Sequence, residues 1–197
     1  WGVLGAAKIA VRKVIPAMQQ CLGIDVVGLA SRDPDRADMT AAALNIPKSY
    51  GVYDALITDP DIDAVYIPLP NHLHLPWAIR AAEAGKHVLC EKPLAMNAAE
   101  VREGIKVQEK TGKFFMEASW NRWHPRTIRL NEIVKSGAIG EVKEIKTAFT
   151  YTDLDPKNIR AIYELGGGGL YDLGPYSVAA PLWLMNFDTC RTKLPTA

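Results

Sequence analysis

Three side chains in the sequence have the types and positions needed for proton-transfer chemistry: Lys92, Asp172 and Tyr176. Lys92 directly follows a short apolar run, and an ammonium there can hold a cofactor or shift the pKa of a neighbour. Asp172 and Tyr176 are four residues apart, so both would lie on one face of a helix. The spacing is equally compatible with a half-buried core tyrosine and a helix-terminal aspartate that the helix dipole favours.

Lys92 belongs to a predicted strand–helix–strand unit. The apolar run Ala64–Ile67 is typical of a buried parallel strand, and it ends at two prolines that cannot continue a sheet ladder. The pattern then predicts a helix over 75–84, closed by Gly85, and a second strand, His87–Cys90. Both strands would deliver their loops to the carboxyl edge of one sheet, where ligands bind in open α/β folds.

The N-terminal segment has the pattern of a dinucleotide-binding turn. Residues 5–10 follow a short apolar strand and read G-A-A-K-I-A, a variant of G-x-G-x-x-G with two alanines. Gly5 would allow the tight turn, Ala7 would face the pyrophosphate and Ala10 would permit close helix packing. The following helix, expected to reach residue 20, would offer its N-terminus to the phosphates. Because two glycines are replaced, an ordinary strand–turn–helix is the alternative interpretation.

The end of the next predicted strand, over 24–30, favours NADP(H) over NAD(H). NAD enzymes usually present a carboxylate there, about twenty residues after the glycine turn. Here Ser31 and Arg32 follow the strand, with Arg36 one helical turn later. A hydroxyl and guanidinium groups suit a 2′-phosphate. The alternative is that Asp33 caps the next helix and the arginines are only solvated.

Strands and helices alternate as far as residue 120. The remaining predicted elements of this part are helices over 34–44, 53–57 and 97–111 and strands over 46–50 and 114–118. The alternation predicts an α/β domain with a doubly wound, mostly parallel Rossmann sheet over residues 1–120. Residues 121–197 are expected to begin an α+β domain, with a helix over 125–136 and a half-buried strand of a second sheet over 141–152.

A run of four glycines, 166–169, precedes the helix that carries Asp172 and Tyr176. Such a run can be a flexible linker. Its position directly before two polar residues on one helical face favours a close-packed approach to a site instead.

Composition and charge exclude several classes of protein. The 197 residues are 48% hydrophobic and 23% charged, as in ordinary globular proteins, and a net charge of +1 gives no electrostatic basis for binding nucleic acid or an anionic membrane. No apolar run approaches the ~20 residues that span a bilayer. Cys21, Cys90 and Cys190 form no metal or redox motif, and His72 and His74 lack a third ligand nearby. We therefore expect no metal, no membrane, and a reducing compartment, the cytoplasm.

Together these motifs resemble the glucose–fructose oxidoreductase / inositol dehydrogenase / MocA (GFO/IDH/MocA) family of nicotinamide-dependent dehydrogenases. The matching segments are 5–10, 30–32, 63–71, 84–88, 91–93 and 167–176. The sequence is most similar to the branch with glucose–fructose oxidoreductase, dihydrodiol dehydrogenase and NADP-dependent xylose dehydrogenases, because it has Tyr176 where many relatives carry histidine. The resemblance implies an NADP(H)-dependent oxidoreductase, with NAD possible. It would transfer a hydride between the nicotinamide and a CH–OH carbon of a sugar, polyol or cyclic diol.

The resemblance also implies roles for single residues. Lys92 would contact the nicotinamide ribose and the substrate, Tyr176 would exchange the substrate proton, and Asp172 would orient a substrate hydroxyl or hold the other two. An ordinary tyrosine, with a pKa of about 10, needs a nearby ammonium to act as a base near neutral pH. The residues expected to bind the cofactor are Gly5, Ala6, Ala7, Lys8, Ile9, Ser31, Arg32, Arg36, Tyr50, Pro68, Leu69, Pro70, Asn71, His74, Glu91 and Lys92, with Arg122 as a further candidate.

The sequence departs from the family after Leu184. Relatives are expected to continue into a large antiparallel sheet that walls the substrate cavity and usually forms a homo-oligomer interface, whereas this chain ends at Ala197. We therefore expect a truncated substrate domain, a strand over 141–152 without sheet partners, and a stronger case for cofactor binding than for catalysis. A catalytically silent NAD(P)-binding protein is the alternative function, and an NAD enzyme of the inositol dehydrogenase type is a third possibility.

Overall fold

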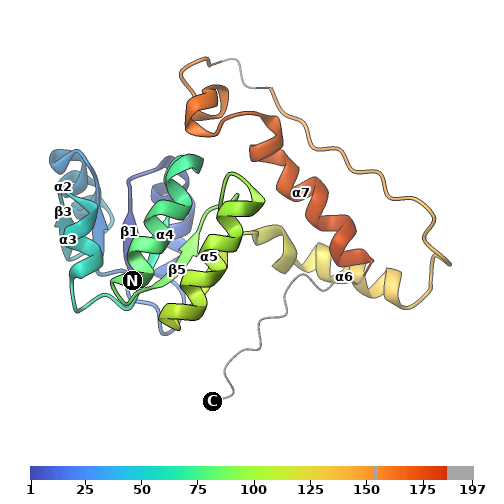
Figure 1. The fold of residues 1–197 in the computed structure, drawn as a ribbon, viewed down its shortest axis with the longest axis horizontal. Helices are drawn as coiled ribbons and strands as arrows, with labels where there is room; N and C mark the ends of the chain where they lie inside the picture. Colours follow the sequence, from blue (N-terminus) through green and yellow to red (C-terminus); the bar gives the residue numbers. More distant parts are fainter. Residues whose placement is uncertain (153–154, 186–197) are drawn as a thin grey trace.

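The computed structural model describes residues 1–152 and 155–185, and its first part is a six-stranded parallel sheet (Figure 1). The spatial order is β3-β2-β1-β4-β5-β6, and every neighbouring pair is parallel. The strand order reverses between β1 and β4, which is the topological switch point of a doubly wound fold. The predicted Rossmann sheet is thus confirmed. Its strands are β1 (Gly2–Leu4), β2 (Gly28–Ala30), β3 (Lys48–Tyr50), β4 (Ala64–Ile67), β5 (His87–Cys90) and β6 (Phe115–Glu117).

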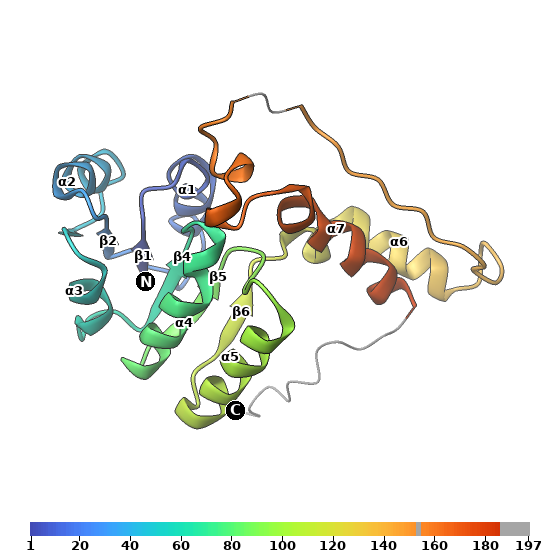
Figure 2. The ribbon, with the colours of Figure 1, turned by 45° about the horizontal axis from the view of Figure 1, so that its top comes forward.

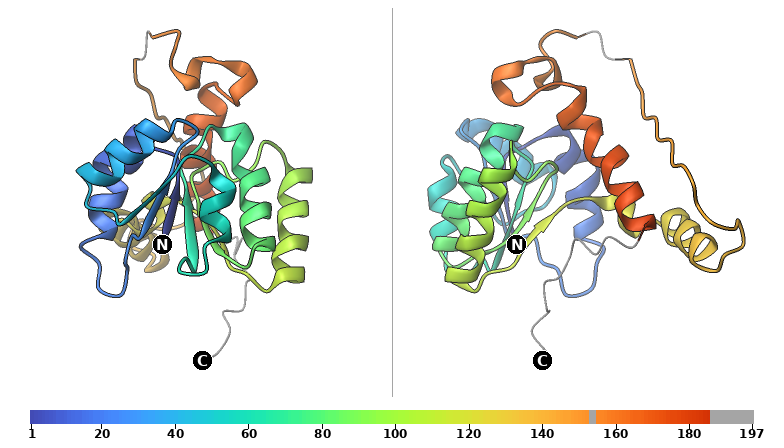
Figure 3. Two further views of the ribbon diagram at one scale, coloured as in Figure 1. Left: turned by 90° about the vertical axis from the view of Figure 1, so that its left-hand side faces the viewer. Right: turned by 45° about the vertical axis from the view of Figure 1, so that its right-hand side comes forward.

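Helices cover both faces of this sheet (Figure 3). Successive side chains of a strand point to opposite faces, so Val3 and Leu4 enter two separate cores. The core around Val3 is closed by α1 (Ile15–Met18) and α2 (Pro34–Ala43). The core around Leu4 is closed by α3 (Tyr53–Thr58) and α4 (His74–Glu83), and α5 (Ala98–Thr111) packs beside α4.

The helix after the glycine turn is less regular than predicted. A π-helical stretch, η1 (Ala10–Val14), precedes α1. Pro16 explains the departure, because it has no N–H for the carbonyl of Arg12 and its ring crowds that carbonyl. The widened turn lies directly before the proline.

Local signals begin and end the other helices as expected. The Asp33 carboxylate accepts the backbone N–H of Arg36 at 3.1 Å and caps α2. Asn97 caps α5 in the same way, and Gly112, at φ +65°, ends that helix.

The second part of the chain contains helices but no second sheet among its described residues. It comprises η3 (Trp120–Trp123), α6 (Pro125–Lys135), η4 (Ile159–Ala161), η5 (Tyr163–Leu165) and α7 (Gly169–Leu184). After α6 the chain continues without regular structure and returns over the carboxyl edge of the sheet at η4 and η5 (Figure 2). None of the helices in the described ranges has both the length and the apolar character that crossing a bilayer demands.

The prediction of a half-buried strand over 141–152 is wrong. Phe149, which the alternation would place on the buried face, is 47% exposed. A strand is stable only within a hydrogen-bonded ladder, and residues 141–152 have no strand alongside them in the described structure. The alternation in the sequence is therefore typical of a strand, but in the described structure no neighbouring strand pairs with this segment.

The contact between α4 and α5 gives a test of the fold. Gly104 is buried at the middle of α5, and a Cβ there would lie 2.8 Å from Leu75 Cδ1. We expect Gly104→Val to lower the free energy of unfolding by about 1–3 kcal/mol, because the added atoms overpack this contact. Glu103→Val, at the exposed neighbouring position, is the control in urea unfolding. Equal effects of the two substitutions would contradict the close packing.

Candidate active site

The glycine turn and the loop after β4 meet at the switch point of the sheet. Gly5 has φ +110°, and a Cβ there would lie 2.9 Å from Leu69 Cδ2. A side chain at this position would be strained and would press on the neighbouring loop. After the turn, Ala6 is buried whereas Lys8 and Ile9 are exposed at the carboxyl edge. Gly5 thus makes the tight turn that the pattern predicts, and phosphate binding stays a prediction.

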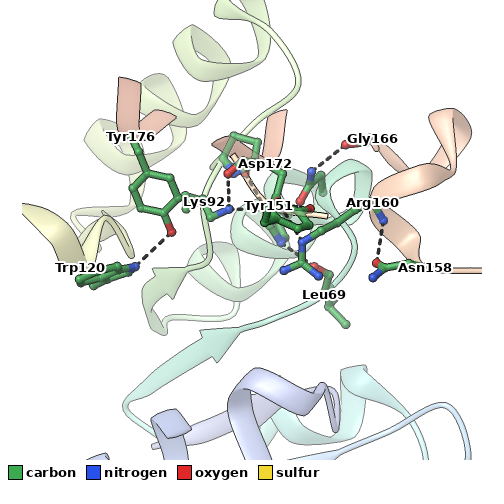
Figure 4. Close-up of polar contacts among 12 residues, drawn as sticks. Leu69, Lys92, Trp120, Tyr151, Asn158, Arg160, Gly166, Asp172 and Tyr176 are labelled. Carbon is green, nitrogen blue, oxygen red and sulfur yellow. Dashed lines mark hydrogen bonds and ion pairs between the residues drawn. The ribbon is translucent and has the colours of Figure 1, made fainter. Parts of the chain in front are cut away.

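Lys92 and Asp172 form a nearly buried ion pair between the two parts of the chain (Figure 4). The Lys92 Nζ atom lies 2.8 Å from Asp172 Oδ1 and donates to the Asp172 backbone carbonyl at 2.6 Å. The two side chains are only 11% and 12% exposed. The pair joins the loop after β5 to the first turn of α7, as the prediction of a shared site requires.

The other carboxylate oxygen of Asp172 accepts two more hydrogen bonds. The Tyr151 hydroxyl donates to Oδ2 at 2.8 Å, and Arg160 Nε donates at 2.9 Å. Burial opposes ionisation, but the hydrogen bonds from Lys92 and Tyr151, with the charges of Lys92 and Arg160, lower the pKa of Asp172. Asp172 is therefore a fixed anion at neutral pH.

Tyr176 lies one turn along α7 and also approaches Lys92. The Lys92 ammonium is 5.1 Å from the centroid of the Tyr176 ring. The centroids of the Phe149 and Tyr176 rings are 5.3 Å apart. The Tyr176 hydroxyl oxygen accepts the indole N–H of Trp120 at 3.1 Å. A hollow of about 430 Å³ opens beside this ring, lined by Arg126, Lys146, Thr147, Ala148, Phe149, Tyr176 and Ser177. A small molecule could reach Tyr176 through it.

The first half of the glycine run, Gly166 and Gly167, is closely packed as predicted, whereas Gly168 and Gly169 are exposed and have open space around them. A Cβ at Gly167 would lie 2.6–2.8 Å from three backbone carbonyl oxygens, and Gly166 has φ +78°. The Asn71 side chain donates to the Gly166 carbonyl at 2.7 Å, and the Tyr171 hydroxyl donates to the Met96 carbonyl at 3.0 Å. These contacts hold the start of α7 against the carboxyl edge of the sheet.

The residues predicted to select NADP gather beside the glycine turn. Arg36 Nη2 donates to the Ala6 carbonyl at 2.5 Å, which places a cation next to the phosphate turn. The buried Ser31 hydroxyl accepts the Asp33 N–H at 3.2 Å, and Arg32 is exposed. Asp33 also caps α2, so the capping interpretation is correct, and the binding of a 2′-phosphate by Arg32 and Arg36 stays a prediction.

Two residues predicted to line the cofactor, His74 and Glu91, have hydrogen-bond partners within the protein. His74 is 0% exposed, and its ring nitrogens lie 2.6 Å from the Pro93 carbonyl and 2.7 Å from the Leu69 carbonyl. It therefore joins the loops after β4 and β5, and burial lowers its pKa although both carbonyls oppose this. Glu91 accepts the Tyr66 hydroxyl at 2.7 Å.

Tyr50 and Arg122 also contact other side chains of the protein. The Tyr50 hydroxyl donates to Asp59, in the loop before β4, and burial together with that bond raises the pKa of Tyr50 to about 12. The Arg122 guanidinium stacks on the rings of Trp123 and Trp183, 5.5 and 5.7 Å from their centroids. Pro68 and Pro70 flank Leu69 in the loop after β4, at the carboxyl edge.

Sequence reasoning missed three residues of the site: Trp120, Tyr151 and Arg160. Tyr151 and Arg160 lie in a stretch without periodicity, where no local pattern marks them. Trp120 follows the last strand of the sheet, and its position at a carboxyl end was the one signal that could have identified it.

Comparison with known proteins identifies the family. Residues 1–119 match a model described as an oxidoreductase family with an NAD-binding Rossmann fold, and residues 127–192 match a model of the GFO/IDH/MocA C-terminal domain. The chain belongs to the GFO/IDH/MocA oxidoreductase family.

Several relatives within the GFO/IDH/MocA family have been named for their activities. D-xylose 1-dehydrogenase (NADP(+)) 2 of Haloferax volcanii is 44% identical, over 91% of this chain and 55% of that protein. Trans-1,2-dihydrobenzene-1,2-diol dehydrogenase of Xenopus tropicalis is 41% identical, over 90% of this chain and 54% of that protein. The chain thus spans about half the length of these relatives.

A solved structure of the family superimposes closely on the structure of this chain. KijD10, a 3-ketoreductase from Actinomadura kijaniata in complex with NADP and TDP-benzene, matches with a TM-score of 0.88 and 35% identity. The match covers 93% of this chain and 56% of KijD10.

The ion pair predicts an acid-sensitive stability. The pKa of Asp172 in the folded chain lies below its ordinary value of 3.8. The contribution of the ionised carboxylate to the free energy of unfolding is therefore present above pH 3.8 and is lost as the pH falls through the lowered pKa. We expect Asp172→Asn to lower the free energy of unfolding at neutral pH by roughly 2–3 kcal/mol, because Lys92 loses its counter-ion. The loss should shrink on acidification.

Urea unfolding across this pH range measures the effect. Asp54→Asn, which breaks the exposed pair with Arg80, is the control and should cost below about 1 kcal/mol. A pH-independent loss for Asp172→Asn would count against the ion-pair explanation.

Proposed function

We propose that this chain is an NADP(H)-dependent oxidoreductase acting on the CH–OH group of a sugar, polyol or cyclic diol. The observation that carries the proposal is the group of Lys92, Asp172 and Tyr176 at the carboxyl edge of a Rossmann sheet. The named relatives support it, since their names specify xylose, a dihydrodiol and a ketoreductase.

The cofactor-binding role assigned to the turn and the adjoining loops is part of the proposal. The structure fits such a group, because Gly5 brings the backbone close without a side chain and Arg36 places a cation beside the turn. The proposed contacts are Gly5, Ala6, Ala7, Lys8 and Ile9 for the pyrophosphate, Ser31, Arg32 and Arg36 for the 2′-phosphate, and Pro68, Leu69, Pro70, Asn71 and Lys92 near the nicotinamide. His74, Glu91 and Tyr50 would support these loops through the framework contacts described above.

The proposed chemistry assigns one role to each catalytic side chain. When bound, the nicotinamide cofactor gives or accepts the hydride. During oxidation the Tyr176 oxygen takes the proton of the substrate hydroxyl, and during reduction it returns that proton to the forming alkoxide. The Lys92 ammonium, held by Asp172, stabilises negative charge on Tyr176 and on the substrate oxygen.

Domain boundaries, location and partners are proposed on the same basis. Residues 1–120 would form the nucleotide-binding domain and 121–197 the beginning of the substrate domain. A balanced net charge of +1 supports a small-molecule partner rather than nucleic acid. We propose the cytoplasm as the location and, by analogy with the family, a homo-oligomer as the assembly.

Cofactor preference tests the first half of the proposal. We expect NADPH to bind at least about tenfold more tightly than NADH, because Arg36 and Arg32 complement the 2′-phosphate. Arg36→Ala should remove most of this preference, whereas Arg102→Ala, on exposed α5, should leave it intact. Fluorescence titration at one salt concentration measures both ligands. Tighter binding of NADH that survives Arg36→Ala would favour an NAD enzyme of the inositol dehydrogenase type.

Turnover tests the second half. In a screen of aldoses and diols with NADP, we expect Lys92→Ala to reduce kcat at least about a hundredfold while NADPH still binds. Lys110→Ala, on the exposed side of α5, is the control and should retain full activity. NADPH binding by the unsubstituted chain without any turnover would favour the alternative, a catalytically silent NAD(P)-binding protein.

A further inference from the structure

The hydroxyl group of Tyr176 has an unexpected hydrogen-bond partner. Trp120, in η3 after the last strand, donates its indole N–H to the Tyr176 oxygen at 3.1 Å (Figure 4). An indole nitrogen is a donor only, so the phenol oxygen must be the acceptor. The phenol proton is not used in this bond and is available to a substrate.

Lys92 contacts the same tyrosine in a different way. Its two hydrogen bonds described above both go to Asp172, and its ammonium faces the Tyr176 ring at 5.1 Å from the centroid. An ammonium at this distance favours a negative phenolate through space. The direct hydrogen bond to the phenol oxygen comes from Trp120.

We propose that Trp120 is a positioning residue that stabilises the phenolate form of Tyr176 through this hydrogen bond. The inference rests on the proposed role of Tyr176 and deepens it. A donated hydrogen bond becomes stronger when its acceptor gains a full negative charge, so Trp120 favours the phenolate over the phenol.

Nearby cations also favour the phenolate form of Tyr176 over the phenol. Lys92 faces the ring and Arg126 of α6 lines the hollow beside it, whereas Lys146, which also lines the hollow, is paired with Glu144 at 3.1 Å. The nearby carboxylate, Asp172, is already paired with Lys92 and Arg160. His124 lies on the far side of Trp120, with ring centroids 6.1 Å apart.

Aromatic contacts hold the phenol ring in place for this bond. The rings of Trp120 and Phe149 lie 6.1 and 5.3 Å from that of Tyr176, tilted by 60° and 58°. During oxidation the substrate hydroxyl proton passes to the Tyr176 oxygen, and the hydride, with its electron pair, passes to the nicotinamide. The Trp120 N–H remains on the indole and serves as a donor throughout.

The test is a spectroscopic titration of Tyr176 in the full chain without cofactor. Near-ultraviolet tyrosinate absorbance is recorded against pH, and subtraction of the same curve for Tyr176→Phe isolates this one residue. We expect Trp120→Phe, which keeps a ring and removes the N–H donor, to raise the titration midpoint by about one pH unit. No shift would overturn the proposal.

Trp123→Phe is the matched control. It lies in the same short helix, but its ring stacks on Arg122. It should leave the midpoint unchanged, and an equal shift in both variants would overturn a specific role for Trp120.

A second measurement avoids any loss of folding. Replacing the five tryptophans by a fluorinated analogue keeps their shape and makes the indole N–H a stronger donor. The midpoint should then fall, and an unchanged midpoint would overturn the proposal.

Activity provides an independent readout. The pH profile of kcat/KM for oxidation should move upward with the titration midpoint in Trp120→Phe. If Trp120→Phe shifts the titration midpoint of Tyr176 but the unsubstituted chain shows no turnover, the role of Trp120 is supported and the proposed function is rejected. The two proposals can therefore fail separately.

Discussion

The ion pair between Lys92 and Asp172 is the interaction on which the rest of the site depends. Moving two charges out of water is costly, and that cost is offset only when both groups are fully hydrogen-bonded. Asp172 meets this condition with Lys92, Tyr151 and Arg160 as donors. Because these partners come from distant parts of the chain, one carboxylate fixes the loop after β5, the segment before η4 and the start of α7. The position of Tyr176 follows from that of α7.

The centre of the parallel sheet was predictable because β1, β2 and β4 are buried on both faces, which produces continuous apolar runs in the sequence. The same reasoning failed over 141–152, because a half-buried strand depends on neighbours that local alternation cannot reveal. The π-helical turn before Pro16 depends on crowding around a carbonyl, which residue type alone indicates only weakly. Local sequence patterns therefore predicted the parallel sheet and the helix caps well. They predicted the structure of residues after 120 poorly.

The site was predictable to a similar extent. Sequence placed Lys92, Asp172 and Tyr176 together, and the structure brings them into contact distance. It could not distinguish a histidine that faces a ligand from one held between two carbonyls, because His74 stands at the start of α4, at the carboxyl edge, in either case. Tyr151 and Arg160 act through a carboxylate that is remote in sequence, so they show no local signal.

The spacing of this pair along the chain has a consequence for biosynthesis. All six strands lie within residues 2–117, whereas Asp172 follows Lys92 by 80 residues. At ribosomal speeds of about 5–20 residues per second, roughly 4–16 s separate the synthesis of the two partners. For the last 55 residues of that interval, from 117 to 172, all six strands have been synthesised while Lys92 still lacks its partner Asp172. The nascent chain therefore completes the strands of the sheet before the residues of α7 have been translated.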